Sequence, residues 1–267
     1  MTVISLQRSH FDATAPLARA NPVAKLVAST VIAFGLLLSV DVVTAGTALV
    51  LELLVLPLAG LTLVALLRRS VVVLLGAVPA GVAAVLFGVD SGATLLDLGP
   101  ISITEGSLAS GVAISLRILA IGLPGIILLS TTDPTDLADG LAQVLRLPSR
   151  VTLAALAATR LLGVMAADWR SMSLARRARG LGGDGPVGAV RAAAGQVFAL
   201  LVLAIRRSTV LATTMESRGF GTDQPRTWAR ESRLHWVDVV VVLGSVVLIA
   251  VAIAAGVAAG TWHLLLT

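Results

Sequence analysis

The feature that most limits the fold of this chain is a series of apolar runs, each close to the roughly 20 residues that a helix needs to cross a bilayer. Hydrophobic residues make up 57% of the sequence and charged residues only 13%, a balance typical of integral membrane proteins. The predicted fold class is therefore all-α, an integral membrane protein with about five transmembrane helices. The predicted spans cover residues 23–40, 42–67, 71–89, 108–130 and 237–259.

The distribution of positive charge predicts how these spans are oriented. Basic residues precede the first span and stand between the second and the third, where Arg68 and Arg69 are adjacent, whereas the segment 90–105 contains neither Lys nor Arg. Because basic segments stay on the cytoplasmic side, we expect a cytoplasmic N-terminus and an external 90–105 loop. The segment 131–235, with 14 Arg against 8 acidic residues, is then cytoplasmic or interfacial.

That charged segment differs from the rest of the chain and divides it into parts covering 1–130, 131–235 and 236–267. It begins with a helix start, in which Asp133 is the predicted N-cap and Pro134 the first helical residue. The pattern predicts a helical module, with long helices that lie across or beneath the membrane spans. Its three predicted helices cover about residues 133–146, 149–179 and 186–218.

Composition excludes most catalytic and ligand-binding chemistry. The chain has no cysteine, and its three histidines, His10, His235 and His263, lie far apart, so we expect no metal site. A P-loop needs a lysine directly before Ser or Thr, but the sole lysine, Lys25, precedes Leu26. Any ATP must therefore be hydrolysed by another polypeptide, and we expect no directly bound cofactor. With no tyrosine and few basic residues interleaved with apolar ones, nucleic acid is not an expected partner, whereas the lipid bilayer is.

One short pattern occurs twice in the charged segment, each time at a predicted helix end. The copies are Ala178-Arg179-Gly180 and Ser217-Arg218-Gly219, 39 residues apart. Glycine supplies the left-handed cap just past a helix, and a cation is favoured near the negative end of the helix dipole. Ordinary cationic helix ends would look the same singly, but the repeat favours a pair of docking tips over a catalytic centre.

At these residues the chain resembles the transmembrane T component of energy-coupling factor transporters, the family that serves cobalt, biotin and other vitamin importers. The resemblance extends from about residue 21 to 222. The matching stretches are NPVAKLVA (21–28), RILAIGLPGIILLSTTDPTDLADGL (117–141), RARG (177–180) and MESRGFG (215–221). One departure is Ser217, where the family usually has alanine.

The resemblance implies a non-catalytic subunit in the cell membrane of a prokaryote. Its partners would be two cytosolic ATPases of the ABC class, which bind ATP, and a membrane-embedded S component that binds a vitamin or transition-metal ion. By this resemblance, Ala178, Arg179 and Gly180 dock into one ATPase, and Ser217, Arg218 and Gly219 into the other. ATP-driven closure would then move the long helices and reorient the S component for uptake.

Two charges fall inside predicted spans, Glu52 and Arg117. Counted from the outer ends of their spans, they lie at similar depth, so an ion pair that lowers the cost of burying each charge is one prediction. Separate hydrogen-bond partners and a proton relay are the alternatives. If the two residues formed a transport site, the chain would instead be a stand-alone secondary transporter. An intramembrane enzyme is disfavoured, because His is scarce and Cys and paired acids are lacking.

Overall fold

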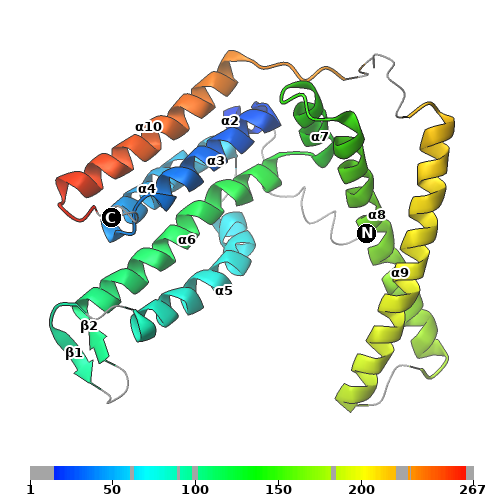
Figure 1. The fold of residues 1–267 in the computed structure, drawn as a ribbon, viewed down its shortest axis with the longest axis horizontal. Helices are drawn as coiled ribbons and strands as arrows, with labels where there is room; N and C mark the ends of the chain where they lie inside the picture. Colours follow the sequence, from blue (N-terminus) through cyan, green and yellow to red (C-terminus); the bar gives the residue numbers. More distant parts are fainter. Residues whose placement is uncertain are drawn as a thin grey trace. The chain divides into compact units, whose positions relative to one another are not determined.

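The computed structural model describes residues 15–60, 63–88, 91–97, 102–181, 185–220, 228 and 230–262. These residues are almost entirely helical, so the predicted all-α class is confirmed (Figure 1). The chain forms two compact units. The bundle unit comprises Met1–Leu137 and Ser232–Thr267, and the helix-pair unit comprises Ala138–Glu231.

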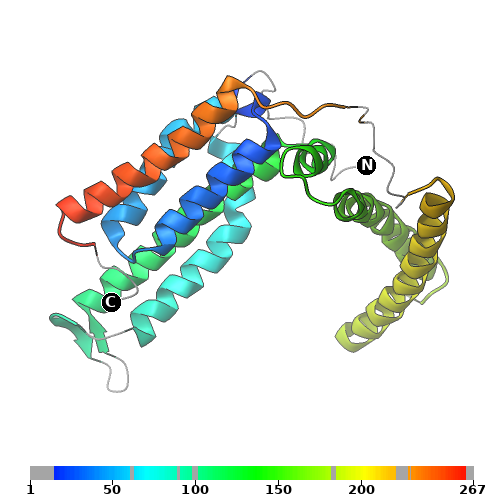
Figure 2. The same ribbon diagram turned by 45° about the horizontal axis from the view of Figure 1, so that its top comes forward.

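In the bundle unit, four helices run side by side around one apolar core (Figures 1 and 2). They are α3 (Pro22–Leu37), α4 (Val42–Val55), α6 (Glu105–Thr131) and α10 (Trp236–Ala258). Three core alanines, Ala48, Ala120 and Ala252, are 0% exposed. Small side chains let the helices approach closely, which suits a bilayer because van der Waals contact is the main attraction between helices there.

A fifth helix, α5 (Leu63–Phe87), packs along α6. One close approach involves Gly81 of α5 and Gly111 of α6. A methyl group on Gly111 would overlap the Val85 side chain and stand 2.7 Å from the carbonyl oxygen of Gly81. Glycine at this position therefore allows the two backbones to touch.

The second predicted span, 42–67, ends earlier than the sequence indicated. Helix α4 passes into a 3-10 turn, η1 (Leu56–Ala59), and Gly60 then takes a left-handed conformation with φ 68°. The next helix, α5, begins before Arg68 and Arg69, so these residues lie inside a helix rather than in the loop between two spans. The prediction was wrong because Pro57 and Gly60 end the helix inside an apolar run that hydropathy alone reads as continuous.

Six helices in the described ranges are long and apolar enough to cross a membrane, close to the predicted number of about five. The difference lies in which helices qualify. The first predicted span corresponds to α3, which has only 16 residues, whereas both long helices of the helix-pair unit meet the length and composition requirement. The six are Val42–Ala59, Leu66–Phe87, Glu105–Thr131, Ser149–Ala178, Val187–Ser217 and Trp236–Ala258.

Part of the polar 90–105 segment forms a hairpin that the sequence did not indicate. Strands β1 (Thr94–Asp97) and β2 (Ser102–Thr104) pair antiparallel, with Thr94 opposite Thr104 and an irregularity in register before Leu96. Helix α6 follows directly, because Thr104 and Ser107 form a capping box at its start.

The helix-pair unit is entered through α7 (Pro134–Gln143) and consists mainly of α8 (Ser149–Ala178) and α9 (Gly185–Ser217). The predicted start of α7 is confirmed, because the Thr135 amide donates a 2.7 Å hydrogen bond to the Asp133 carboxylate. This helix ends before Arg146, which adopts a left-handed conformation with φ 53°. Its end therefore comes slightly earlier than the sequence predicted.

Candidate docking site

The first arginine tip ends α8 in a Schellman motif. Gly180 has φ 70°, its amide donates to the carbonyl of Arg177 at 3.0 Å, and the Leu181 amide donates to the carbonyl of Arg176 at 2.9 Å. Arg179 occupies the C-cap itself. The cap therefore fixes the backbone from which this arginine projects.

The second tip repeats this arrangement at the end of α9. Gly219 has φ 75°, its amide donates to the carbonyl of Glu216 at 2.9 Å, and the Phe220 amide donates to the carbonyl of Met215 at 2.9 Å. Arg218 is thus the counterpart of Arg179. The two helix ends predicted from sequence are confirmed as matching left-handed caps, while their docking role stays a prediction.

Both tips are open to the surroundings. The six residues of the two tripeptides are exposed. Within the described ranges, the guanidinium groups of Arg179 and Arg218 make no hydrogen bond or ion pair. Among the described residues, no neighbouring atom lies within 4 Å of the position that a side chain on Gly180 or Gly219 would occupy. The guanidinium groups of Arg179 and Arg218 could therefore enter a groove without first breaking a contact to another described residue.

The two tips lie at opposite ends of the α8–α9 pair. The helices run in opposite directions and cross (Figure 1), and the Arg176 side chain near the end of α8 comes within 3.4 Å of the position that a side chain on Gly195 of α9 would occupy. Because the end of α8 lies near Gly195, the 23 residues from there to Arg218 separate the tips by about 35 Å at about 1.5 Å per residue. A single groove on one small protein could not hold both.

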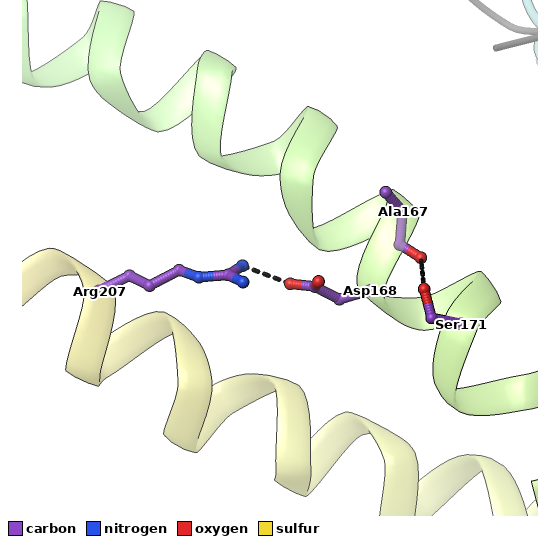
Figure 3. A network of polar contacts seen from close by, with 4 residues as sticks. All are labelled: Ala167, Asp168, Ser171 and Arg207. Atoms are coloured by element: carbon purple, nitrogen blue, oxygen red, sulfur yellow. Dashed lines mark hydrogen bonds and ion pairs between the residues drawn. The ribbon is translucent and has the colours of Figure 1, made fainter. Parts of the chain in front are cut away.

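Polar contacts between the helices connect α8 with α9. Asp168 of α8 forms an ion pair with Arg207 of α9 (Figure 3). Nearer the turn, the Gln196 amide donates a 3.1 Å hydrogen bond to the Ser173 hydroxyl. Directional contacts at two points resist sliding of one helix along the other.

Most of the apolar surface of this pair is uncovered. Only 6% of the residues in the apolar window of each helix are buried. Large exposed side chains on α9 include Phe198, at 69% exposed, and Val190, at 70%. An apolar surface of this extent marks contact with lipid or with another protein.

The predicted ion pair between Glu52 and Arg117 is absent from the described part of the chain. Both Glu52 carboxylate oxygens and the Arg117 Nε are buried without a hydrogen-bond partner. Glu52 lines an apolar cavity of about 500 Å³ between the helices of the bundle unit, and Arg117 is not part of its lining. Similar depth in two spans does not fix the direction in which each helix turns its side chains, so the prediction failed.

The sequence missed a polar cluster at one end of the bundle unit. Asn21 caps α3, as its identity predicts, by accepting from the Val23 amide at 2.9 Å. It also contacts residues near the start of α10, including Asp238, which is 3% exposed. An acid at the start of an apolar helix was the available signal, but the sequence could not name its partner.

Comparison with known proteins identifies relatives over most of this architecture. A family model described as CbiQ, cobalt transport protein, matches residues 13–228, which include both arginine tips. The energy-coupling factor transporter transmembrane protein EcfT of Bacillus subtilis (strain 168) is 31% identical over 170 residues, covering 60% of this chain and 63% of the relative. Its namesake from Macrococcus caseolyticus (strain JCSC5402) is 30% identical over 164 residues, covering 57% and 61%. The chain thus aligns with less than two-thirds of each relative.

Proposed function

We propose that this chain, which belongs to the CbiQ cobalt transport protein family and is a T component of an energy-coupling factor transporter, couples ATP hydrolysis to solute uptake. Two partner ATPases would hydrolyse the ATP. The observation that carries the proposal is the pair of equivalent, exposed arginine tips on one braced helix pair, with guanidinium groups that have no ion-pair partner among the described residues. The chain itself is non-catalytic in this proposal, and the partners bind ATP.

The arginine side chain of each tip is suited to binding in an acidic groove. A guanidinium offers five N–H donors in a planar fork, which suits carboxylates and backbone carbonyls. The Schellman cap holds the backbone on either side of Arg179 and of Arg218, so less conformational entropy is lost when the side chain is bound. Ala178 and Ser217 are small, which permits close approach of a groove wall.

The separation of the tips supports two partners rather than one. Anchors about 35 Å apart fit two ATPases that each hold one helix end. When the ATPases approach each other on binding ATP, the two ends are drawn together. The Asp168–Arg207 contact, about two-thirds of the way along each helix, then acts as the region about which α8 and α9 rotate.

The uncovered apolar faces of α8 and α9 support a membrane-embedded partner. An S component that packs on these faces would be tilted when the helices rotate, which would expose its binding site to the cytoplasm. The transported solute, a vitamin or a transition-metal ion, is selected by that partner. The proposed location is the cell membrane of a prokaryote, with a cytoplasmic N-terminus.

Co-purification tests this function directly. An affinity-tagged chain isolated from its native membranes should carry two ABC-class ATPase subunits and an S component. Arg179→Ala and Arg218→Ala should each weaken ATPase binding by about 10- to 100-fold, since hydrogen bonds to a charged group contribute about 1.5–3 kcal/mol. The double variant should lose the ATPases altogether.

Arg160→Ala and Arg191→Ala are the matched controls. They remove exposed arginines from the interiors of α8 and α9 and should leave ATPase binding unchanged. Equal losses in the controls would mean that overall charge, not the tips, holds the partners. Ion-driven uptake by the chain alone, with no ATPase in the preparation, would overturn the proposal.

A further inference from the structure

The helix-pair unit is joined to the bundle unit by two stretches of chain. One begins at Thr131, the last residue of α6, and passes into the helix-pair unit after Leu137; the other returns to the bundle unit at Ser232, just before α10. Both stretches meet the first turns of α3 within the bundle unit. The contacts there are polar, buried and long-range in sequence.

Lys25 holds the departing stretch. Its ammonium donates to the carbonyl oxygen of Thr131 at 3.2 Å, to the hydroxyl of Thr131 at 3.1 Å, and to the carbonyl oxygen of Ala18 at 3.0 Å. These acceptors match the three donors of the ammonium, and the residue is only 5% exposed. Two of the three hydrogen bonds of the chain's sole lysine thus hold the end of α6, and the third goes to Ala18, ahead of α3.

Asn21 holds the returning stretch. Its side-chain amide donates to the Ser232 hydroxyl at 2.9 Å and to the carbonyl oxygen of Arg233 at 3.2 Å, and its backbone amide donates to Asp238 at 2.6 Å. Asp238 also accepts from the His235 amide at 2.6 Å. Every polar group of the Asn21 side chain is therefore used, because its oxygen caps α3.

Asn21 and Lys25 are four residues apart, so they project from neighbouring points of one helical turn. The carboxylates of Asp238 and Asp136 attract the Lys25 ammonium, which joins the two sets of contacts electrostatically. One turn of α3 thus holds both ends of the inserted unit, although the residues it contacts are about 100 positions apart in the sequence.

We infer that the first turns of α3 form an anchor for both connections of the helix-pair unit, in which Asn21 and Lys25 are positioning residues that make movement of that unit act on the bundle. The anchoring itself follows from the contacts above, whereas the part concerned with coupling rests on the proposed function. A connection that is fixed to the bundle transmits a displacement of the helix-pair unit to it. A connection that is not fixed changes its own conformation instead.

Two variants separate the anchor from other roles of these residues. Lys25→Met keeps the length of the side chain and removes all three donors. Asn21→Ser keeps a good N-cap, because serine can still accept from the Val23 amide, but removes the two donors that reach Ser232 and Arg233. Thr30→Val is the control, since among the described residues the Thr30 hydroxyl bonds to Leu26 of its own helix alone.

The first measurement is hydrogen exchange of the full chain in lipid nanodiscs. Lys25→Met should raise exchange about 10-fold around residues 131–135, and Asn21→Ser should do the same around 232–236, each leaving the other segment less affected. Lys25→Arg, which retains donors, should restore part of the protection. Exchange that stays at the wild-type level in both segments would overturn the anchor, and so would equal changes in Thr30→Val.

The second measurement is solute uptake per ATP hydrolysed by the reconstituted complex. Both variants should retain bound ATPases while this ratio falls at least fivefold, a combination that loss of folding would not produce. An unchanged ratio despite raised exchange would overturn the positioning role. A wild-type chain that binds no ATPases would refute the proposed function and, with it, the coupling role, while the exchange experiment would still decide the anchor.

Discussion

The two units of this chain bury their side chains in opposite ways. The bundle unit has a core of Leu, Ile and Ala side chains, and several of its alanines are 0% exposed. In the described parts of α8 and α9, by contrast, each helix buries a single side chain, and both of these residues, Thr152 and Gln196, are polar. The helix pair therefore has no apolar interior of its own.

This difference separates a part that has a buried apolar core from a part that has none. The bundle unit also leaves large apolar side chains uncovered, such as Phe34 and Phe87, but its helices share a core besides. The helix pair is held by polar contacts such as Asp168–Arg207, and its apolar faces are left to lipid or protein. We interpret the uncovered surface of α8 and α9 as the surface that would bind partners and move with them.

The sharpest test of this contrast truncates one large side chain in each unit. Leu36 in the bundle core is 1% exposed, so Leu36→Ala should lower the free energy of unfolding by about 2–5 kcal/mol, because it leaves a cavity. Phe198 on α9 is 69% exposed, so Phe198→Ala should change that energy by less than about 0.5 kcal/mol. Denaturation by SDS titration in mild detergent micelles measures both.

In the assembled complex the order should reverse. Phe198→Ala should weaken binding of the S component, while Leu36→Ala should act only through folding. Equal destabilisation by the two substitutions in micelles would show that the helix pair has an interior of its own, which would remove the contrast.

A second test uses the same substitution, glycine to alanine, in both units. A methyl group at Gly111 would overlap the Val85 side chain, so Gly111→Ala should cost about 1–3 kcal/mol. Nothing lies within 4 Å of the corresponding position on Gly163 of α8, so Gly163→Ala should instead stabilise the helix by about 0.5–1 kcal/mol. Opposite signs in the same unfolding assay support the comparison, and equal signs contradict it.

A third test examines the contact between α8 and α9. Asp168 and Arg207 are partly exposed, at 25% and 34% of their side-chain surfaces, so their ion pair should contribute only about 0.5–1 kcal/mol. A double-mutant cycle with Asp168→Asn and Arg207→Gln measures that coupling energy. Exchanging the charges, Asp168→Arg with Arg207→Asp, should recover part of it. A coupling energy indistinguishable from zero would mean that the hydrogen bond between Gln196 and Ser173 is the polar contact that holds α8 to α9.

Contacts along the chain were predictable from sequence. The long apolar runs predicted helices, Asp133 and Pro134 predicted the start of α7, and Gly180 and Gly219 predicted the two left-handed caps. Each of these depends on residues within about four positions, so its physical cause is contained in a short stretch of sequence.

Contacts between distant residues were not predictable in the same way. Asn21 and Asp238 are 217 positions apart, and nothing in either local pattern specifies the other. Glu52 and Arg117 show the same limit, because sequence gave their depth but not the rotation of their helices. The candidate site was found only because both tips are local motifs, whereas the anchor on α3 became visible once the fold was known.

The smallest expected effect concerns Ser217, the position where the two tips differ. The Ser217 hydroxyl donates a 2.9 Å hydrogen bond to the carbonyl oxygen of Thr214, one turn back in α9, so it is already used within its own helix. Removing it by Ser217→Ala should change ATPase affinity by less than about twofold, equivalent to about 0.4 kcal/mol. Ser217→Leu, which adds bulk beside Arg218 without changing its charge, should weaken binding more than tenfold if a groove wall lies close. Titration of the purified ATPases against nanodisc-embedded variants distinguishes the outcomes. Equal affinities of the Ser217→Ala and Ser217→Leu variants would mean that the ATPase contacts only the guanidinium group of this tip. A large loss of affinity in Ser217→Ala would mean that the serine hydroxyl contacts the ATPase and that the two tips bind differently.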